Sequence, residues 1–203
     1  MTIKSLQSTS LTNNIFYRSM LAGNDAYFPE FESDDFLEEV VLTTSASSVT
    51  FSGLASYATA GYKHLQIRMA AGCAAGFDSS GYLELNGDST ASYSHHRLQG
   101  SGSIVSAAGG SSDTYILIQA MLSSNAYPNE FAAGVFDFLD FSSSSKNTTI
   151  RALHGHKGTG SQKVSLSSGA YLNTDAITSL TVGGAGGNSM RAGSRFSLYG
   201  SKA

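Results

Sequence analysis

The chain of 203 residues has a single cysteine, Cys73, and few charged side chains. One cysteine excludes an intrachain disulfide, so stability has to come from packing and oligomer contacts. We expect Cys73 itself to be a small buried hydrophobe. Charged residues make up 13% of the chain, against about 25% in an average soluble domain. The surface is therefore expected to be covered by serine, threonine and asparagine, or by other copies of the chain.

Basic patches and long apolar runs are also missing. Fifteen acidic residues against twelve basic ones give a formal net charge of -3, without the clustered basic face that nucleic-acid binding requires. No segment approaches the ~18 apolar residues of a membrane span, and the start of the chain lacks the apolar core of a secretory signal. We expect a protein made in the cytoplasm that binds no nucleic acid and does not insert into membranes.

What the sequence does contain is a repeated alternation of polar and apolar residues that ends at glycine-rich turns. The clearest copies are Tyr62–Arg68, Phe136–Phe141 and Gly193–Gly200. Side chains on a strand point to opposite faces in turn, so each copy offers one face to a core and the other to water. Strands are predicted at 37–44, 48–53, 62–70, 81–86, 92–98, 114–121, 130–141, 147–155, 162–167, 176–182 and 193–200. Turns are predicted at Asn86–Asp88, Gly100–Gly102, Ala107–Gly110 and Gly183–Gly187.

This succession of strands predicts an all-β domain, an antiparallel β-sandwich of jelly-roll type, over residues 36–203. Residues 1–35 differ from the rest and form an N-terminal arm that is too rich in aromatic residues to remain a solvated tail. A short helix is predicted over Asn14–Leu21. We expect the arm to serve anchoring or oligomer contacts through Ile15, Phe16, Tyr17, Tyr27, Phe28 and Phe31.

The spacing of the polar residues argues against an enzyme, and we expect neither catalytic residues nor a cofactor. The sequence has no Gly-x-Ser-x-Gly motif, which would place a serine at a strained turn. His96 and Asp88 therefore lack a serine with which to form a catalytic triad. Asp137 and Asp140 should lie on opposite faces of a strand, so they are not a glycosidase pair. Asp137 is a better partner for an arginine; the candidates are Arg68, Arg97, Arg151 and Arg195. The adjacent His95 and His96 should also point to opposite faces.

Two further groups leave alternatives open. His154 and His156 flank Gly155 and would share one face of a strand, but two imidazoles fall short of the three or four ligands that zinc needs. They are either a metal contact or a solvated loop pair. The acidic run is either a solvated segment or a docking strip for a basic neighbour or a cation. Its members are Glu30, Glu32, Asp34, Asp35, Glu38 and Glu39.

Tyrosines near predicted strand ends are candidate contacts for a ligand. Aromatic side chains at loop tips suit sugar stacking and protein interfaces alike. The candidate loops carry Tyr57, Tyr93, Tyr127 and Tyr171. About half of such tyrosines are expected to pack at the edge of the core instead.

Several of these motifs, taken in order, resemble a recurrent module of tailed-bacteriophage structural proteins, notably those of marine and cyanobacterial phages. The resemblance covers residues 31–200 and is carried by Tyr62–Arg68, Leu85–Asp88, His96–Gly100, Phe138–Thr148, Leu166–Gly169 and Ala192–Gly200. It implies a β-sandwich displayed on the virion surface and no catalytic residues. Since the chain has no coiled-coil heptads and no collagen-like repeat, a compact subunit is favoured over a long shaft.

The function expected on these grounds is that of a non-enzymatic structural protein of a tailed phage virion. It would be a capsid decoration protein, a knob or a short tail-fibre subunit that forms a symmetric homo-oligomer and contacts other virion proteins of the capsid or tail. The alternative is a carbohydrate-binding module that recognises a host cell-surface glycan as receptor. A glycan-degrading enzyme is a remote third possibility.

The anchoring role of the arm can be tested by deleting residues 1–31. If the aromatic residues of the arm bury apolar area against a neighbour, the shortened protein should fold but should no longer be incorporated into virions. Circular dichroism would measure folding, and quantitative electrophoresis of purified virions would measure incorporation. Normal incorporation would contradict the anchoring role.

Overall fold

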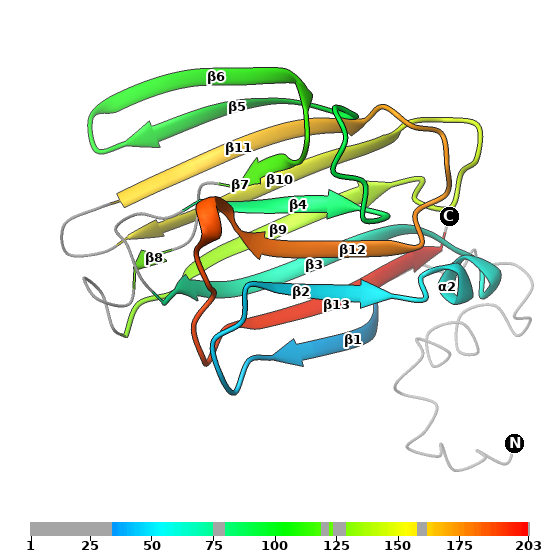
Figure 1. Cartoon of the computed structure of the whole chain (residues 1–203), viewed down its shortest axis with the longest axis horizontal. Coiled ribbons are helices and arrows are strands. Elements are labelled where there is room, and N and C mark those ends of the chain that lie inside the picture. Colours follow the sequence, from blue (N-terminus) through cyan, green and yellow to red (C-terminus); the bar gives the residue numbers. More distant parts are fainter. Residues whose placement is uncertain (1–33, 75–79, 119–121, 124–128, 158–161, 203) are drawn as a thin grey trace, which may run out of the picture. The chain divides into compact units, whose positions relative to one another are not determined.

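The computed structural model describes residues 34–74, 80–118, 122–123, 129–157 and 162–202, and these form two antiparallel sheets packed together (Figure 1). The prediction of an all-β antiparallel sandwich is confirmed. The arm residues Ile15, Phe16, Tyr17, Tyr27, Phe28 and Phe31, the helix expected near Asn14 and the candidate Tyr127 lie outside the described residues.

The larger sheet has the strand order β1-β13-β3-β9-β10-β11-β5-β6, and β8 adds a short parallel pairing to the end of β3. Its strands are β1 (Asp35–Val41), β3 (Tyr62–Cys73), β5 (Tyr93–Ser101), β6 (Ile104–Asp113), β8 (Leu122–Ser123), β9 (Ala132–Leu139), β10 (Thr148–Lys157), β11 (Gln162–Tyr171) and β13 (Arg195–Lys202). The smaller sheet has the order β2-β12-β4-β7. Its strands are β2 (Ser48–Ser52), β4 (Gly81–Leu85), β7 (Ile116–Ile118) and β12 (Ser179–Gly184). Two short helical turns complete the described elements, α2 (Ala55–Thr59) and η3 (Ala185–Gly187).

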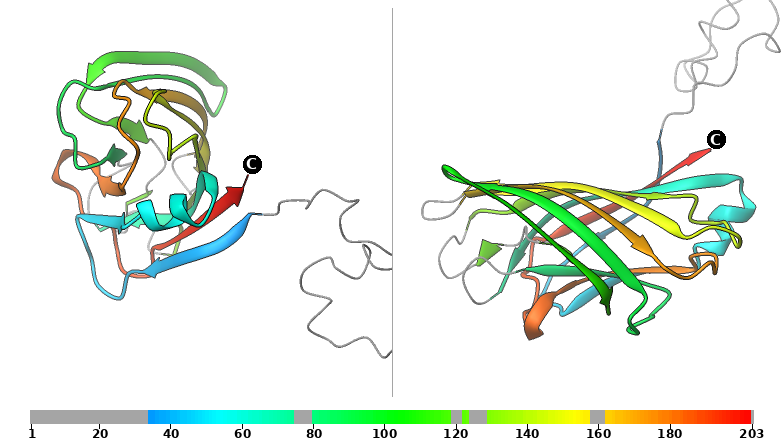
Figure 2. Two further views of the ribbon diagram at one scale, coloured as in Figure 1. Left: turned by 90° about the vertical axis from the view of Figure 1, so that its right-hand side faces the viewer. Right: turned by 90° about the horizontal axis from the view of Figure 1, so that it is seen from above.

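Eight of the strands pair as nested partners from the two ends of the chain inward. β1 pairs with β13, β2 with β12, β3 with β9 and β4 with β7, all antiparallel, and these pairs belong alternately to the larger and the smaller sheet. In the right-hand view of Figure 2, β10 and β11 lie in one layer and β12 in the other. The finer expectation of a jelly roll remains a prediction, and this nesting supports it. The hairpins β5–β6 and β10–β11 widen the larger sheet beyond the nested set.

The core between the sheets follows the alternation of the sequence. In β3, Leu65 and Ile67 are buried, whereas Arg68 is exposed. Phe136 and Phe138 of β9 are likewise fully buried, at alternate positions. Full burial of such a side chain is worth about 1.5–3 kcal/mol relative to exposure, so these strands supply much of the stabilisation of the fold.

Two glycines of the predicted turns, Gly109 and Gly183, are strand residues. The turn predicted at Gly183–Gly187 is present only from Ala185 onward, in η3, where Gly186 and Gly187 have positive φ angles of 69° and 78°. Ala107–Gly110 lies inside β6, a strand that was not predicted, and Gly183 lies inside β12. At Gly109 a Cβ would lie 2.9 Å from the carbonyl oxygen of His95, and at Gly183 it would lie 2.3 Å from the ring of Tyr82. Glycine is needed here because a neighbour comes close, not because the chain turns.

The predicted turn at Asn86–Gly87 is present, and both residues have positive φ angles, 57° and 66°. The Asn86 side chain reaches across to the segment that leads into β12. Its Oδ1 accepts hydrogen bonds from the backbone nitrogens of Thr178 (2.7 Å) and Ser179 (3.3 Å), and its Nδ2 donates to the carbonyl of Ala176 (3.1 Å). This turn therefore ties the end of β4 to the start of β12.

Asp88, the next residue, anchors the two largest polar aromatic side chains of the core. Tyr171 donates its hydroxyl to Asp88 Oδ2 at 2.9 Å, and Tyr93 donates to the Asp88 carbonyl at 2.9 Å. The two rings lie 5.1 Å apart. Hydrogen bonds from the Thr90 side chain and backbone, with a further one from Tyr171, lower the pKa of Asp88 to about 2. The carboxylate form is thus the form that the fold prefers.

Replacing Asp88 with asparagine should destabilise the protein more at neutral pH than in acid. Because the folded pKa lies below the ordinary 3.8, the charged group contributes stability above pH 3.8 and loses it as the pH falls toward 2. At pH 7 we expect the melting temperature of Asp88→Asn to fall by about 2–4 °C, and the difference from the wild type should shrink below pH 3.8. Thermal melts at pH 7 and pH 2.5 measure this, with the exposed Asp175→Asn as control. An equal deficit at both pH values would contradict the assignment.

Candidate interaction surface

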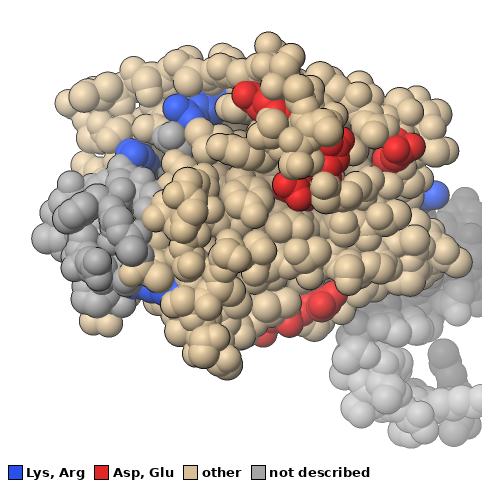
Figure 3. Space-filling view, in the orientation of Figure 1, with Lys and Arg blue, Asp and Glu red and all other residues tan. Residues whose placement is uncertain are grey.

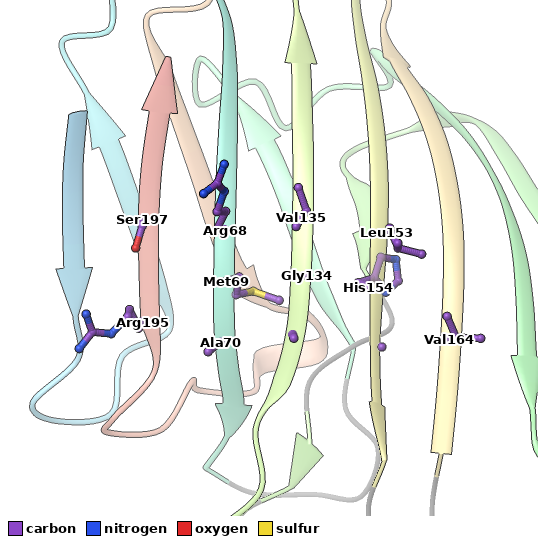
Figure 4. Close-up of a pocket in the computed structure, with 12 residues that line it drawn as sticks. Arg68, Met69, Ala70, Gly134, Val135, Leu153, His154, Val164, Arg195 and Ser197 are labelled. Carbon is purple, nitrogen blue, oxygen red and sulfur yellow. The ribbon is translucent and has the colours of Figure 1, made fainter. Parts of the chain in front are cut away.

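Two rows of side chains cross the outer face of the larger sheet, which is the face turned away from the smaller sheet (Figure 4). Both follow directly from the strand register. The first row is Glu39, Ser197, Arg68, Val135, Leu153, Leu166, Leu98 and Ala107. The second row is Val41, Arg195, Ala70, Ala133, Gly155, Val164, Gly100 and Val105. Residues directly opposite on neighbouring strands have Cβ atoms ~5 Å apart, so each row is a continuous surface.

From β9 to β6, the large side chains of these rows are apolar and exposed to solvent. We call this group the apolar outer face; it consists of Val135, Leu153, Leu166, Leu98, Val164 and Val105. Their exposed fractions range from 38% to 73%. Isolated exposed apolar residues are ordinary, but a contiguous patch of them marks a place where something binds.

The polarity of β10 and β11 is inverted at the middle of each strand, relative to an ordinary half-buried strand. Their outward positions hold Leu153 and Leu166, whereas inward positions hold His154, Ser165 and Ser167. The apolar positions of an alternating strand were expected to face the core. Alternation alone shows that two faces differ, and it does not show which of the two is covered.

A hollow of about 540 Å³ lies at the boundary between the apolar outer face and the charged part of the rows. It forms where the second row is made of small residues, Ala70, Ala133 and Gly155. Figure 4 shows Arg68 and Arg195 on one side of it and Leu153 and Val164 on the other. The hollow is therefore an apolar depression bordered by two guanidinium groups.

Both guanidinium groups are neutralised by carboxylates of the same chain. Arg68 Nη2 lies 3.1 Å from Asp34 Oδ2, and Arg195 Nη1 lies 2.8 Å from Glu39 Oε2. Ser197 donates a hydrogen bond to Glu39, and this bond, together with Arg195, lowers the pKa of Glu39. The described acidic residues Asp34 and Glu39 thus have partners within the chain, whereas Glu30 and Glu32 lie outside the described residues.

The row beside the apolar outer face is polar, and it contains the predicted ion pair of Asp137. Arg151 proves to be the partner: its Nε and Nη2 lie 3.0 and 2.8 Å from Asp137 Oδ2. Gln66 donates to the other carboxylate oxygen at 2.8 Å. These side chains border the apolar outer face with a polar rim, as in many protein interfaces.

The inner side of the same strands carries a buried polar row, in which His154, Ser165 and Gln99 are cross-strand neighbours. His154 is 3% exposed, its Nε2 lies 3.3 Å from Ser167 Oγ, and its ring stacks at 6.0 Å on Phe136. Burial, with a smaller effect of Arg97, lowers the pKa of His154 to about 4. The imidazole is therefore neutral inside the sandwich at pH 7.

The other histidines that the sequence singled out can also be placed. His154 and His156 share one face, as predicted, but both are buried within β10, so the interpretation as a solvated loop pair is wrong. Among the described residues there is no group of three or more potential metal ligands. His95 and His96 point to opposite faces, as predicted; His95 Nδ1 lies 3.0 Å from Asp113 Oδ2, and His96 is exposed.

The candidate ligand tyrosines are not gathered at one place. Tyr93 and Tyr171 are fully buried, so these two candidates pack into the core and are not contacts at a loop tip. Tyr57 is half-buried on α2, with its ring edge-on to Tyr62 at 6.3 Å. The hydroxyl groups of Tyr93 and Tyr171 both donate hydrogen bonds to Asp88. For Tyr171 this partner is 83 positions away in the sequence, so no local pattern indicates it.

Protonation of His154 should destabilise the protein as the pH falls. The unfolded chain binds this proton near pH 6.5 and the folded chain only near pH 4, so stability is lost progressively between these values, by up to about 3 kcal/mol. His154→Gln should flatten the dependence in this window, whereas the exposed His96→Gln should not. Urea unfolding at pH 7.5, 6, 5 and 4 measures the slope. A wild-type slope retained in His154→Gln would assign the pH dependence elsewhere.

Charge is sparse on the described surface. In Figure 3 most of the visible face is neither acidic nor basic, and its few blue and red groups are scattered. No helix within the described ranges is long and apolar enough to cross a membrane.

Comparisons with known proteins identify no relative of this chain. No family model matches the chain, and neither the curated proteins nor the solved structures contain a match. The resemblance to tailed-phage structural proteins therefore stays an expectation from the sequence, and function has to be argued from the chain's own residues.

Proposed function

We propose that the protein is a non-enzymatic structural protein whose β-sandwich self-associates through the apolar outer face into a symmetric homo-oligomer. The observation that carries this proposal is the in-register row of Val135, Leu153, Leu166 and Leu98, which are exposed on four adjacent strands. Removing apolar surface from water is worth roughly 25 cal/mol per Å². Covering this row would therefore stabilise an assembly.

The chemistry of the surface favours a second copy of the chain as the occupant. The apolar outer face contains no charged residue, and two ion pairs at its borders, Arg68–Asp34 and Arg151–Asp137, are formed within the chain. Like copies therefore meet little electrostatic repulsion when these faces approach each other. An apolar centre with a polar rim is also the usual anatomy of an interface between subunits.

The place of this assembly is proposed on the sequence resemblance alone, because a fold does not determine a function. On that basis it is the virion surface of a tailed phage, where the subunits would form a decoration, a knob or a short fibre and contact capsid or tail proteins. The alternative of a glycan-binding module is weakened, since two of its proposed contacts, Tyr93 and Tyr171, are buried.

Charge placed in the centre of the apolar outer face should dissociate the oligomer. Leu153→Glu and Leu166→Glu each introduce a carboxylate that self-association would have to bury without a partner. We expect the dissociation constant of the oligomer to rise at least tenfold, as measured by sedimentation velocity over a concentration series. The matched control is Ser52→Glu, at an exposed position of β2 in the smaller sheet. Melting temperatures would verify that all variants fold.

A monomeric wild-type protein at 100 µM would contradict the proposal. So would a Leu153→Glu variant that is folded and associates as strongly as the control.

A further inference from the structure

β6 is an open edge of the larger sheet. It spans Ile104–Asp113 and pairs with β5 only, at one end of the strand order. Eight of its ten residues are exposed, and only Gly110 and Asp113 are half-buried. An edge strand presents a line of unpaired backbone donors and acceptors, which another strand can bind.

The other sheet edges are protected against such pairing. β1, at the opposite end of the larger sheet (Figure 1), contains Asp35, Glu38 and Glu39 and has a register shift between Phe36 and Glu38. The edges of the smaller sheet are short, with five residues in β2 and three in β7. Charge, irregularity and shortness are the usual means of protecting an edge.

β6 has none of these protections over most of its length. Between Ile104 and Ser111 it contains no charged residue and no proline. The irregular part is confined to its end, where Ser112 has a φ of 59° and the register with β5 shifts. Asp113, the one charged residue, lies there, with its Oδ2 3.0 Å from Nδ1 of His95. The segment 104–111 is therefore a regular, uncharged and open edge.

We infer that β6 pairs antiparallel with β6 of a second copy, so that two larger sheets join into one sheet across a twofold axis. This inference rests on the proposed homo-oligomer and adds to it a second contact, at the sheet edge, beside the one through the apolar outer face. An antiparallel edge is complementary to itself under a twofold rotation, since each residue pair then occurs twice with the partners exchanged.

The apolar rows support the choice of a second copy and of the register. The first row ends on β6 at Ala107 and the second at Val105. If Ala107 lies opposite Ala107 of the partner subunit, the first row continues without interruption onto the Leu98 side chain of the second copy. The small side chains of Ala107, Ala108 and Gly109 leave the approach of the two strands unobstructed.

Disulfide cross-linking in the full chain tests this register. Directly opposite residues of an antiparallel pair have Cα atoms ~4.5–5.5 Å apart, within the usual ~4.4–6.8 Å of a disulfide. Ala107→Cys should therefore give a covalent dimer on mild oxidation, seen by non-reducing electrophoresis and reversed by reductant. The natural Cys73 is fully buried, so the introduced thiol is the accessible one. Ser52→Cys on β2 is the matched control, and a yield no higher than that of the control would overturn the pairing.

A second variant tests the same contact without a cross-link. Ala107→Lys places two ammonium groups opposite each other across the axis. We expect the dissociation constant of the oligomer to rise at least tenfold in sedimentation velocity. The melting temperature of the variant is expected to stay unchanged. Unchanged association would overturn the edge pairing. If the Ala107 variants behave as the controls while Leu153→Glu dissociates the oligomer, the edge pairing is wrong and the proposed function stands. If the wild type is monomeric, both are wrong.

Discussion

The backbone ladder that joins eight strands determines where the other features of the described sandwich lie. Because side chains alternate with a period of two, the register from β1 to β6 decides at once which residues enter the sandwich and which face solvent. A slip by one residue between β9 and β10 would bury Leu153 and expose His154. The ladder also aligns the two rows of the outer face, which belong to strands that are far apart in the sequence.

The smaller sheet has only four strands, and this difference in width divides the larger sheet into two regions. Beneath the nested strands the inward positions are apolar, as with Phe136, Phe138 and Ile67. Farther along, β10, β11 and β5 turn His154, Ser165 and Gln99 inward. Leu153, Leu166 and Leu98 of these strands lie outside, whereas Ile150, Tyr171 and Tyr93 enter the core. The widened part of the sheet is therefore held by its backbone ladder together with a core at one end of these strands.

Much of this architecture was predictable from alternation and turns. The strands at Tyr62–Arg68 and in the closing segment, the Asn86–Gly87 turn and an arginine partner for Asp137 are all present. β6 was missed because a run of alanine, glycine and serine has no alternation of polarity to detect. The candidate surface was missed for a different reason. Alternation with a period of two gives each strand two different faces, but it does not tell which face the smaller sheet covers.

A sheet that ends in β6 at one side and β1 at the other has two different edges, and this limits how far it can grow. The carboxylates and the irregular register of β1 disfavour the addition of another strand. If β6 of a second copy joins there, the combined sheet ends in a protected β1 edge at both sides and cannot lengthen step by step. Each larger sheet then has one edge that can accept a strand of another copy, so that pairing at β6 would give a dimer and not a fibre.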